Sequence, residues 1–191
     1  MKRCSWVPSD NGLYCDYHDK EWGKPIYEDQ ALFELLCLES YQSGLSWLTV
    51  LKKRQAFRQV FHHYDIEAVS DDIEAVSAFT QEEMIAALKN PAIIRHRLKL
   101  EATVNNARAV QEIQKEFGTL SSYLWEFVEG QPLDNLVNKD NPVPAQSALS
   151  VVLARDLKKR GFKFLGPTTI YSFMQASGMI NDHEEDCSFR Y

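Results

Sequence analysis

The chain divides two thiols and two imidazoles between its ends. Cys4 and His18 lie near the amino terminus, and His183 and Cys187 lie near the carboxyl terminus. Structural zinc is bound tetrahedrally by Cys and His side chains in this mixture. The spacing of His183 and Cys187 places both side chains on one face of a helical turn. A metal bound by all four residues would join the two ends of the chain, which restricts the fold to one in which the ends meet.

The spacing alone leaves one ligand of this site open. Zinc motifs usually contain two short pairs, whereas thirteen residues separate Cys4 from His18. Cys15 and His18 form a tighter local pair, so Cys15 is an alternative source of the thiolate. Lone cysteines are also often small buried hydrophobic residues. From the residues alone, a zinc site and a set of buried cysteines both remain possible, with Cys4 and Cys15 competing.

The composition predicts one compact globular domain. The chain has 191 residues, of which 45% are hydrophobic, and this is enough for a sizeable core. No apolar run follows Met1, Lys2 and Arg3, and no long uncharged hydrophobic segment occurs, so we expect neither a signal peptide nor a membrane span. Four cysteines without a paired pattern fit a reducing compartment. We therefore expect a cytoplasmic protein with free thiols.

Charge is unevenly distributed along the chain. The net charge of −6 argues weakly against a nucleic-acid partner, because counterion release favours positive surfaces. Seven acidic residues and no basic residue occur between Asp65 and Glu83. Three compact basic clusters occur elsewhere, at Lys52-Lys53-Arg54, at Arg95-His96-Arg97 with Lys99, and at Lys158-Lys159-Arg160 with Lys163. They form a nucleic-acid surface if they share a face, but solvated helix faces are the simpler interpretation.

Apolar periodicity predicts helices nearly throughout the chain and no persistent strand. Asp29 is the expected N-cap of a helix that ends near Ser40, and an amphipathic helix begins near Ser46 and runs to about Phe61. Further helices are expected at about 81–89, 96–116, 120–128, 146–160 and 167–177. The best loop candidate, 134–144, is too short for a domain linker. The expected fold class is therefore all-α, in a single domain of residues 1–191.

One short segment is duplicated in the acidic stretch. The sequence from Asp65 to Ser70 recurs from Asp72 to Ser77, an offset of seven residues. Seven residues are close to two α-helical turns, so the insertion rotates the following chain by only about 20°. We interpret it as a tandem duplication in a surface helix, because two copies are too few for a repeat fold.

A helix-hairpin-helix is predicted at about 81–116. A helix ends near Lys89, residues 90–92 form a tight turn, and a basic segment with Arg95 and Arg97 opens the next helix. Backbone N–H groups at such a turn can bind a phosphate, and the two arginines would strengthen the contact. An ordinary helix pair with a basic second helix accounts for the pattern equally well.

Aromatic side chains with polar tips crowd the first fifty residues. They are Trp6, Tyr14, Tyr17, Trp22, Tyr27, Tyr41 and Trp47. Such residues usually lie in a core or at its rim, but flat π-faces with hydrogen-bonding tips also suit a pocket for a flat, positively charged base. Glu39 lies among them, before a turn that contains a glycine. Most helix-end glutamates are solvated, whereas a carboxylate beside aromatics in an uncharged run is a candidate site residue.

Several longer blocks occur together along nearly the whole chain. They are Arg3-Cys4-x-Trp6, Tyr17-His18-Asp19-x-Glu21-Trp22-Gly23, Glu39 through Trp47, Ile93-Ile94-Arg95-His96-Arg97, and Gly161 through Ala176 continuing to Asn181-Asp182-His183. In these blocks and their order the chain closely resembles the 3-methyladenine DNA glycosylase I family. The resemblance implies the all-α helix-hairpin-helix glycosylase fold, with a zinc snap, formed by 4–18 and 183–187, that joins the termini. It also implies excision of 3-methyladenine from double-stranded alkylated DNA, which releases the free base and leaves an abasic site.

The resemblance also assigns roles to residues. The implied ligands of one zinc ion are Cys4, His18, His183 and Cys187, which favours Cys4 over Cys15. The implied pocket contains Glu39 as the catalytic carboxylate and, as substrate-binding residues, Tyr17, Trp47, Trp6, Tyr14 and Trp22. A metal with four protein ligands has no open position for water, so we expect the zinc to be structural.

Four residues are candidate DNA contacts. Arg95 and Arg97 belong to the predicted hairpin, and Gln42 and Leu45 lie in the turn after Glu39. Apolar and amide side chains commonly fill the gap left by an extruded nucleotide, which is the role we expect for Gln42 and Leu45, although Leu45 could equally be a core residue.

The chemistry expected of such a pocket is mild. Alkylation at N3 makes the nucleobase cationic, so the base stacks on electron-rich rings and departs as a neutral species with little acid catalysis. We therefore expect Glu39 mainly to bind and polarise the base. Related hairpin glycosylases place an Asp shortly beyond the hairpin, but the first Asp after Ala92 is Asp134, so no residue is assigned to position the water. Ala92 also stands where a glycine is common, and alanine tolerates left-handed backbone poorly.

Two other classes of protein remain as alternatives. One is a non-catalytic, zinc-stapled DNA-binding module, and the other is a structural protein whose metal only closes the fold. Neither class needs a carboxylate in an aromatic pocket, so Glu39 beside Tyr17 and Trp47 favours the enzyme. The simplest expectation for an enzyme that acts on DNA in this way is a monomer.

Overall fold

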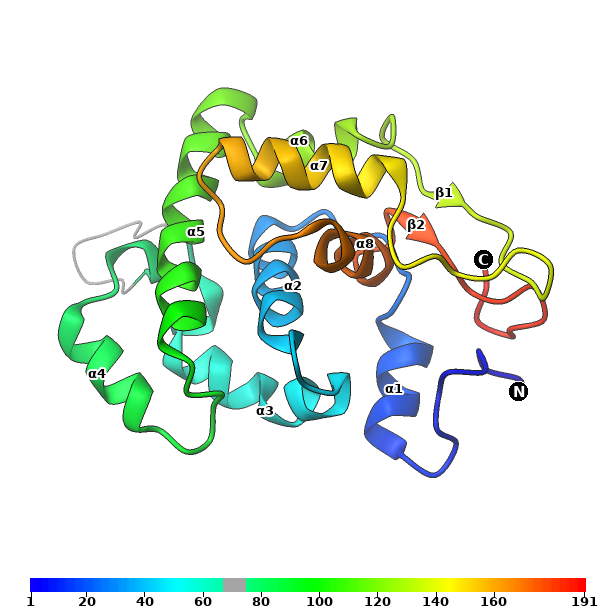
Figure 1. The fold of residues 1–191 in the computed structure, drawn as a ribbon, viewed down its shortest axis with the longest axis horizontal. Coiled ribbons are helices and arrows are strands. Elements are labelled where there is room, and N and C mark those ends of the chain that lie inside the picture. The colour runs from blue at the N-terminus through cyan, green and yellow to red at the C-terminus, as the bar shows by residue number, and fades with distance from the viewer. Residues whose placement is uncertain (67–74) are drawn as a thin grey trace.

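The structure is a computed structural model that describes residues 1–66 and 75–191. Its α-helices are α1 (Gly12–Lys20), α2 (Asp29–Gln42), α3 (Trp47–Val60), α4 (Gln81–Lys89), α5 (Arg97–Phe117), α6 (Leu120–Glu126), α7 (Ala148–Lys159) and α8 (Pro167–Ala176). The remaining elements are the 3-10 helices η1 (His62–Tyr64) and η2 (Val76–Ala78) and the strands β1 (Leu133–Asp134) and β2 (Ile180–Asn181). The strands pair in parallel, and both chain termini lie on the same side of the molecule as this small sheet (Figure 1). The predicted helical character is confirmed.

Helix α2 forms the centre of the fold. Every residue from Leu32 to Tyr41 is buried, so the helix is enclosed on all sides rather than amphipathic. Helices α3, α5, α6 and α8 pack around it. Glu34, one of two acidic residues in this buried stretch, accepts hydrogen bonds from the guanidinium groups of Arg54 and Arg58 at 2.9 and 2.7 Å. The other acidic residue is Glu39, which lies at the C-terminal end of the helix.

Local sequence signals set most of the helix ends. The side chains of Asn11, Ser46 and Thr80 accept hydrogen bonds from backbone N–H groups in the first turns of α1, α3 and α4. Pro167 begins α8, and Gly118, with a φ of 83°, ends α5. The helices expected from the sequence agree with the observed ones within two residues at each end.

Two features of the amino-terminal part differ from expectation. The prediction that Asp29 caps its own helix is wrong, because Asp29 is the first residue of α2. Its carboxylate instead accepts hydrogen bonds from the backbone N–H groups of Leu120 and Ser121, at 2.8 and 2.9 Å, and so caps α6. Helix α1 is absent from the predicted elements, because its buried residues, Tyr17 and His18 among them, form no aliphatic stripe.

The predicted hairpin is formed by α4 and α5. Its turn is closed by the side chain of Asn90, which accepts a hydrogen bond from the backbone N–H of Ala92 at 2.9 Å. Lys53 of α3 donates to the carbonyl oxygens of Pro91 and Ala92 at 3.1 and 3.0 Å. Ala92 does not have a positive φ, so the turn needs no glycine at this position.

The duplicated segment 65–77 lies mostly outside the described residues, so its predicted helix is not tested. The described ends of the segment are held together, because the Ser77 hydroxyl donates a hydrogen bond to the carbonyl oxygen of Ile66 at 3.2 Å. Gln111 of α5 donates to the same two groups, which fastens both ends to the hairpin. Over the described part of the chain, no helix has an apolar stretch of the length that crossing a membrane requires.

Candidate functional site

Four buried side chains from the two ends of the chain form a metal-type cluster. One possible ligand atom of each of Cys4, His18, His183 and Cys187 lies within 4.8 Å of all the others. The sulfur atoms of Cys4 and Cys187 are each 3.5 Å from His183 Nδ1, and Cys187 Sγ is 3.6 Å from His18 Nε2. Zinc bound tetrahedrally, with bonds of about 2.3 Å to sulfur and about 2.0–2.1 Å to nitrogen, separates such atoms by about 3.5 Å. The cluster fits a zinc ion in donor type and in spacing.

Cys15 lies outside this cluster. Its sulfur atom contacts the carbonyl oxygen of Pro8 at 3.6 Å, so the geometry selects Cys4 as the amino-terminal thiol. The expected helical turn between His183 and Cys187 is wrong. The segment forms a non-helical turn instead, in which the backbone N–H of Cys187 donates to the carbonyl oxygen of Glu184 at 2.8 Å.

Both imidazoles of the cluster are oriented by their second nitrogen atoms. His18 Nδ1 lies 2.8 Å from Asp19 Oδ1, and the guanidinium of Arg3 in turn donates to the Asp19 carboxylate at 2.7–3.0 Å. His183 Nε2 lies 3.3 Å from the carbonyl oxygen of Trp22. Such partners fix the tautomer and point the remaining nitrogen at the metal position. Sequence reasoning did not single out Asp19, although its place directly after His18 was a usable signal.

The cluster is closely surrounded by protein. A Cβ at Gly23, where φ is 80°, would lie 2.8 Å from His183 Nε2, so only glycine fits beside this ring. Burial raises the pKa of the Cys4 thiol to about 12 and lowers the pKa of His183 to about 4. A bound divalent cation would stabilise the thiolate and the neutral imidazole at this position.

Glu39, Tyr17 and Trp47 form a second buried group. They come from three elements, α2, α1 and α3, and are exposed by only 5%, 4% and 7%. The rings of Tyr17 and Trp47 are tilted by 52°, with centroids 5.4 Å apart. Trp47 Nε1 is buried and has no hydrogen-bond partner among the described residues. A buried donor without a partner is rare in folded proteins and points to a missing acceptor, such as one on a ligand.

Burial favours the neutral form of the Glu39 carboxyl group. Burial raises its pKa to about 8, and no cation of the described chain opposes this shift. Burial, followed by the nearby Glu39 carboxylate, also raises the pKa values of Tyr14 and Tyr17. A positively charged ring placed beside Glu39 would favour the ionised carboxylate and would stack on the neighbouring aromatic faces. The group is therefore suited to a flat cation.

Trp6 and Trp22 contact the metal-type cluster through His18, and Tyr14 lies between Trp6 and the group around Glu39. The ring of Trp6 is 5.7 Å from that of Tyr14, 4.9 Å from that of Trp22 and 5.4 Å from that of His18. Trp6 is 38% exposed, whereas Trp22 is 7% exposed. The predicted aromatic residues thus extend from the group around Glu39 to the metal-type cluster, along α1, which carries Tyr14, Tyr17 and His18.

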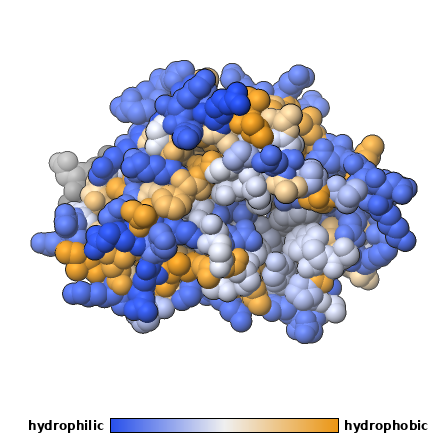
Figure 2. Space-filling model, viewed as in Figure 1, coloured by the Kyte–Doolittle hydropathy of each residue, from blue (hydrophilic) through white to orange (hydrophobic). Residues whose placement is uncertain are grey.

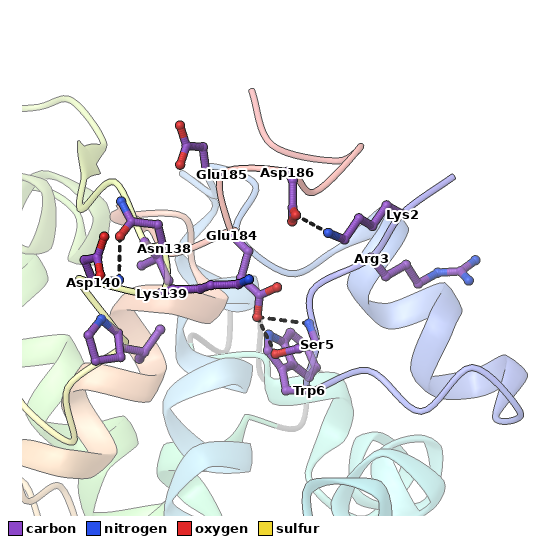
Figure 3. A pocket seen from close by; sticks show the side chains of 13 residues that line it. Lys2, Arg3, Ser5, Trp6, Asn138, Lys139, Asp140, Glu184, Glu185 and Asp186 are labelled. Carbon is purple, nitrogen blue, oxygen red and sulfur yellow. Dashed lines mark hydrogen bonds and ion pairs between the residues drawn. The ribbon is translucent and has the colours of Figure 1, made fainter.

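A cavity of about 860 Å³ opens beside the chain termini. Figure 3 shows it between the amino-terminal segment, the loop before α7 and the carboxyl-terminal segment. Trp6 lines this cavity, but Glu39 does not. Its charged side chains are of both signs, and Lys2 pairs with Asp186, so its walls carry no uniform charge that would select a cation. The group around Glu39 is the better candidate site, and the face viewed in Figure 2 is hollowed between α8 and α1.

The predicted basic clusters are largely engaged within the protein. Arg54 binds Glu34, and Arg160 binds Asp156 and Glu116 at 2.8 and 2.7 Å. By contrast, Arg95 and Arg97 at the hairpin are exposed, with Arg97 only 3.5 Å from Glu101 in the next turn of α5. Both side chains are accessible to a phosphate at the hairpin.

Lys99 is buried, although the sequence placed it in a basic cluster with exposed Arg95 and Arg97. It is 6% exposed, and its ammonium group donates to the carbonyl oxygens of Tyr41 and Ser43 at 2.9 and 2.7 Å. It thereby binds the C-terminal end of α2 and fixes the turn that carries Gln42 and Leu45. Gln42 is half-buried and Leu45 is 40% exposed, so Leu45 is not a core residue.

The fold and these sites define a helical protein of the DNA glycosylase class. A crystal structure of a variant of 3-methyladenine DNA glycosylase I in complex with 3-methyladenine matches with a TM-score of 0.91 and 36% identity, covering 100% of this chain and 98% of that chain. The chain belongs to the methyladenine glycosylase family, whose model matches residues 6–191.

Two relatives match over almost their whole length. A DNA-3-methyladenine glycosylase of Haemophilus influenzae is 45% identical over 185 residues, which cover 97% of this chain and 96% of the relative. DNA-3-methyladenine glycosylase 1 of Escherichia coli is 42% identical over 187 residues, which cover 98% of this chain and 96% of the relative.

Proposed function

We propose that the protein is an enzyme that hydrolyses the N-glycosidic bond of 3-methyladenine in alkylated DNA, releasing the free base and leaving an abasic site. Membership of the methyladenine glycosylase family supports this activity, as do full-length relatives named for it. The observation in this chain that carries the proposal is the buried carboxyl group of Glu39 beside the rings of Tyr17 and Trp47.

Recognition of the damaged base follows from charge and shape. Methylation at N3 leaves a positive charge on the adenine ring while the ring is still attached to its sugar. The ring stacks against Tyr17 and Trp47, and its charge shifts Glu39 to the carboxylate, which accepts hydrogen bonds from the polar edge of the base. The unpartnered Trp47 Nε1 supplies a donor for a ring acceptor. Unmethylated adenine has no such charge, so it would leave Glu39 protonated and bind more weakly.

Catalysis at this site requires little proton transfer. When the glycosidic bond breaks, its electron pair stays with the base and neutralises the positive charge of the ring. The leaving base therefore needs no added proton. Glu39 in its ionised form stabilises the positive charge that shifts towards the sugar, and water adds to the sugar carbon and loses a proton to the solvent. Asp134, the first aspartate after the hairpin, lies in β1 and binds Arg190, and we assign it no part in this step. To enter the pocket, the base must leave the stack of the DNA duplex, which costs a few kcal/mol. The methylated base pairs more weakly than adenine, and this lowers the cost.

The metal-type cluster is assigned a structural role. Zinc would be held by Cys4, His18, His183 and Cys187, and with four protein ligands it would bind no water. When bound, it supplies a rigid link between the termini. Through this link the segment with Trp6 and helix α1 keep their positions, and with them the Tyr17 wall of the pocket.

The activity is tested by incubating the purified protein with methylated duplex DNA and identifying the released bases by chromatography. Release of 3-methyladenine with the expected abasic sites supports the proposal, and release of several alkylated bases would widen the substrate range. If the protein binds DNA but releases no base, the non-catalytic binding module replaces this proposal.

A further inference from the structure

Phe164 is an exposed aromatic residue in an unfavourable backbone conformation. Its side chain is 42% exposed, and its φ of 60° lies in the left-handed region that bulky residues avoid. Such conformations persist only where the surrounding structure holds them, and they concentrate at functional sites. The core offers no reason for an exposed phenyl ring at this position.

Two asparagines of α5 hold the loop that carries Phe164. Asn106 is 3% exposed, and its amide forms a reciprocal pair with the backbone of Lys163, donating to the carbonyl oxygen at 3.0 Å and accepting from the N–H at 2.9 Å. The neighbouring Asn105 donates to the carbonyl oxygen of Gly161 at 2.8 Å. These bonds attach the loop before α8 to α5, the second helix of the hairpin. One of the attachment points is Lys163, the residue before Phe164.

The same helix brings Phe164 close to the turn that follows Glu39. The Phe164 ring lies edge-on to the ring of His96, the N-cap of α5, with centroids 6.3 Å apart. Three residues later, Lys99 binds the carbonyl oxygen of Ser43 at 2.7 Å. The first turn of α5 thus contacts both Phe164 and the turn that carries Leu45.

The surface around this turn combines apolar and cationic side chains. Leu98 and Leu45 are 58% and 40% exposed, and Figure 2 shows apolar residues gathered over α4 and the first half of α5. The side chains of Arg95, Arg97 and Lys163 are exposed beside them. A cationic rim around exposed apolar groups matches a nucleic acid, whose phosphates bind the cations while its bases offer flat apolar faces.

We propose that Phe164 contacts DNA directly, stacking on a nucleobase of the duplex beside the position of the extruded nucleotide. This inference rests on the proposed function, because it takes the bound partner to be damaged duplex DNA. Leu45 and Phe164 then both contact the opened helix. The ring acts on the DNA and not on the excised base, which occupies the separate group around Glu39.

The experiment compares three substitutions of Phe164 in binding to a duplex that contains a stable abasic-site analogue. Phe164→Ala should weaken binding about tenfold, the order of effect that loss of one stacked base produces. Phe164→Leu, which keeps apolar bulk without a π-face, should be weakened similarly, whereas Phe164→Trp should bind within about twofold of the natural protein. The fluorescence of 2-aminopurine, placed next to the analogue, should change more on saturation with the natural protein than on saturation with Phe164→Leu.

The control is Tyr27→Ala, which removes an aromatic side chain that is 55% exposed and stacks on Trp125. It should leave duplex affinity unchanged. Binding of free 3-methyladenine, followed by protein fluorescence, should be the same in Phe164→Ala and the natural protein. Full duplex affinity in both Phe164→Ala and Phe164→Leu would overturn the inference, as would an equal loss of free-base binding. Neither result would touch the proposed function, which fails only if the natural protein releases no 3-methyladenine.

Discussion

His183 packs its ring edge-on against the ring of Trp22, with centroids 4.7 Å apart, and its Nε2 atom lies 3.3 Å from the Trp22 carbonyl oxygen. Trp22 follows α1, and its ring lies 4.9 Å from that of Trp6. His183 of the metal-type cluster is thus in direct contact with Trp22, which follows the helix that carries Tyr17. The cluster can therefore affect the base pocket by holding Tyr17 in place, without chemistry at the metal.

Removal of one thiol tests this structural role. Cys187→Ser should lower the bound zinc from about one ion per chain towards zero. Loss of a metal site is strongly destabilising, so we expect the free energy of unfolding to decrease by at least about 3 kcal/mol. For a chain of this size that corresponds to a fall of about 6–12 °C in Tm. Metal analysis and thermal unfolding measure the two effects, and base excision should decline only as the fold is lost.

The matched control is Cys15→Ser, which changes another buried thiol outside the cluster. It should retain the zinc. Equal metal loss in both variants would show that Cys15 is a ligand, and an unchanged metal content in Cys187→Ser would contradict the assignment of the cluster.

Asp19 should tune the metal affinity although it does not touch the metal position. Asp19→Asn weakens the contact that orients His18, and changes of this kind typically cost about 10–100-fold in metal affinity. Competition with a chelator measures the loss. Asp16→Asn is the control, because Asp16 is exposed on the same helix and pairs only with Lys20 among the described residues. If both variants bind zinc as the natural protein does, Asp19 does not orient His18.

Lys99 should contribute to stability through the turn after α2. Lys99→Met leaves two backbone carbonyl oxygens without their donor, and a decrease of about 1–3 kcal/mol in the free energy of unfolding is expected. Urea denaturation measures it, with Lys52→Met as the control at an exposed position on α3. The same stability in both variants would mean that the buried ammonium group is not needed to hold the turn.

Glu39 should make the natural protein less stable as the pH rises. Its pKa is about 8 in the folded protein and 4.5 when unperturbed, because burial disfavours the carboxylate. Between these values the folded state holds a proton that the unfolded state has lost, so stability falls with rising pH by about 1.4 kcal/mol per unit for this group. The stability that the protonated Glu39 carboxyl group contributes is fully present below about pH 4.5 and is lost by about pH 8.

Glu39→Gln has no such titration, so the variant should be more stable than the natural protein, by an amount that grows with pH. From pH 5 to pH 8 the difference in the free energy of unfolding should increase by an amount of the order of 3 kcal/mol. Urea denaturation at both pH values measures it. A difference that does not change with pH would show that Glu39 is ionised in the free protein.

The sequence predicted those elements whose stability is local. The helices expected at 81–89 and 167–177 begin where the structure places α4 and α8, at a Thr80–Glu83 capping box and at Pro167, because capping and proline geometry act within one turn. Helix α1 was not predictable in this way. Its buried side chains include Tyr17 and His18, which contact Trp47 of α3 and Cys187 at the far end of the chain.

The same distinction applies to single side chains. Asp29 caps a helix ninety residues away and Lys99 binds the end of α2, whereas local rules assigned both to their own segments. The choice of Cys4 over Cys15 also depends on which thiol reaches His183 in space. Tertiary contacts decide such roles, so patterns of neighbouring residues do not reveal them.

The most direct test is single-turnover excision from a duplex that contains 3-methyladenine, with natural protein and Glu39→Gln compared at equal duplex occupancy. The natural protein should release 3-methyladenine, and Glu39→Gln, folded and bound to the same DNA, should release it at least about 100-fold more slowly, as expected for loss of one preorganised electrostatic group. Equal rates in the two proteins would contradict the account, because the buried carboxylate would then play no part in recognising or releasing the base.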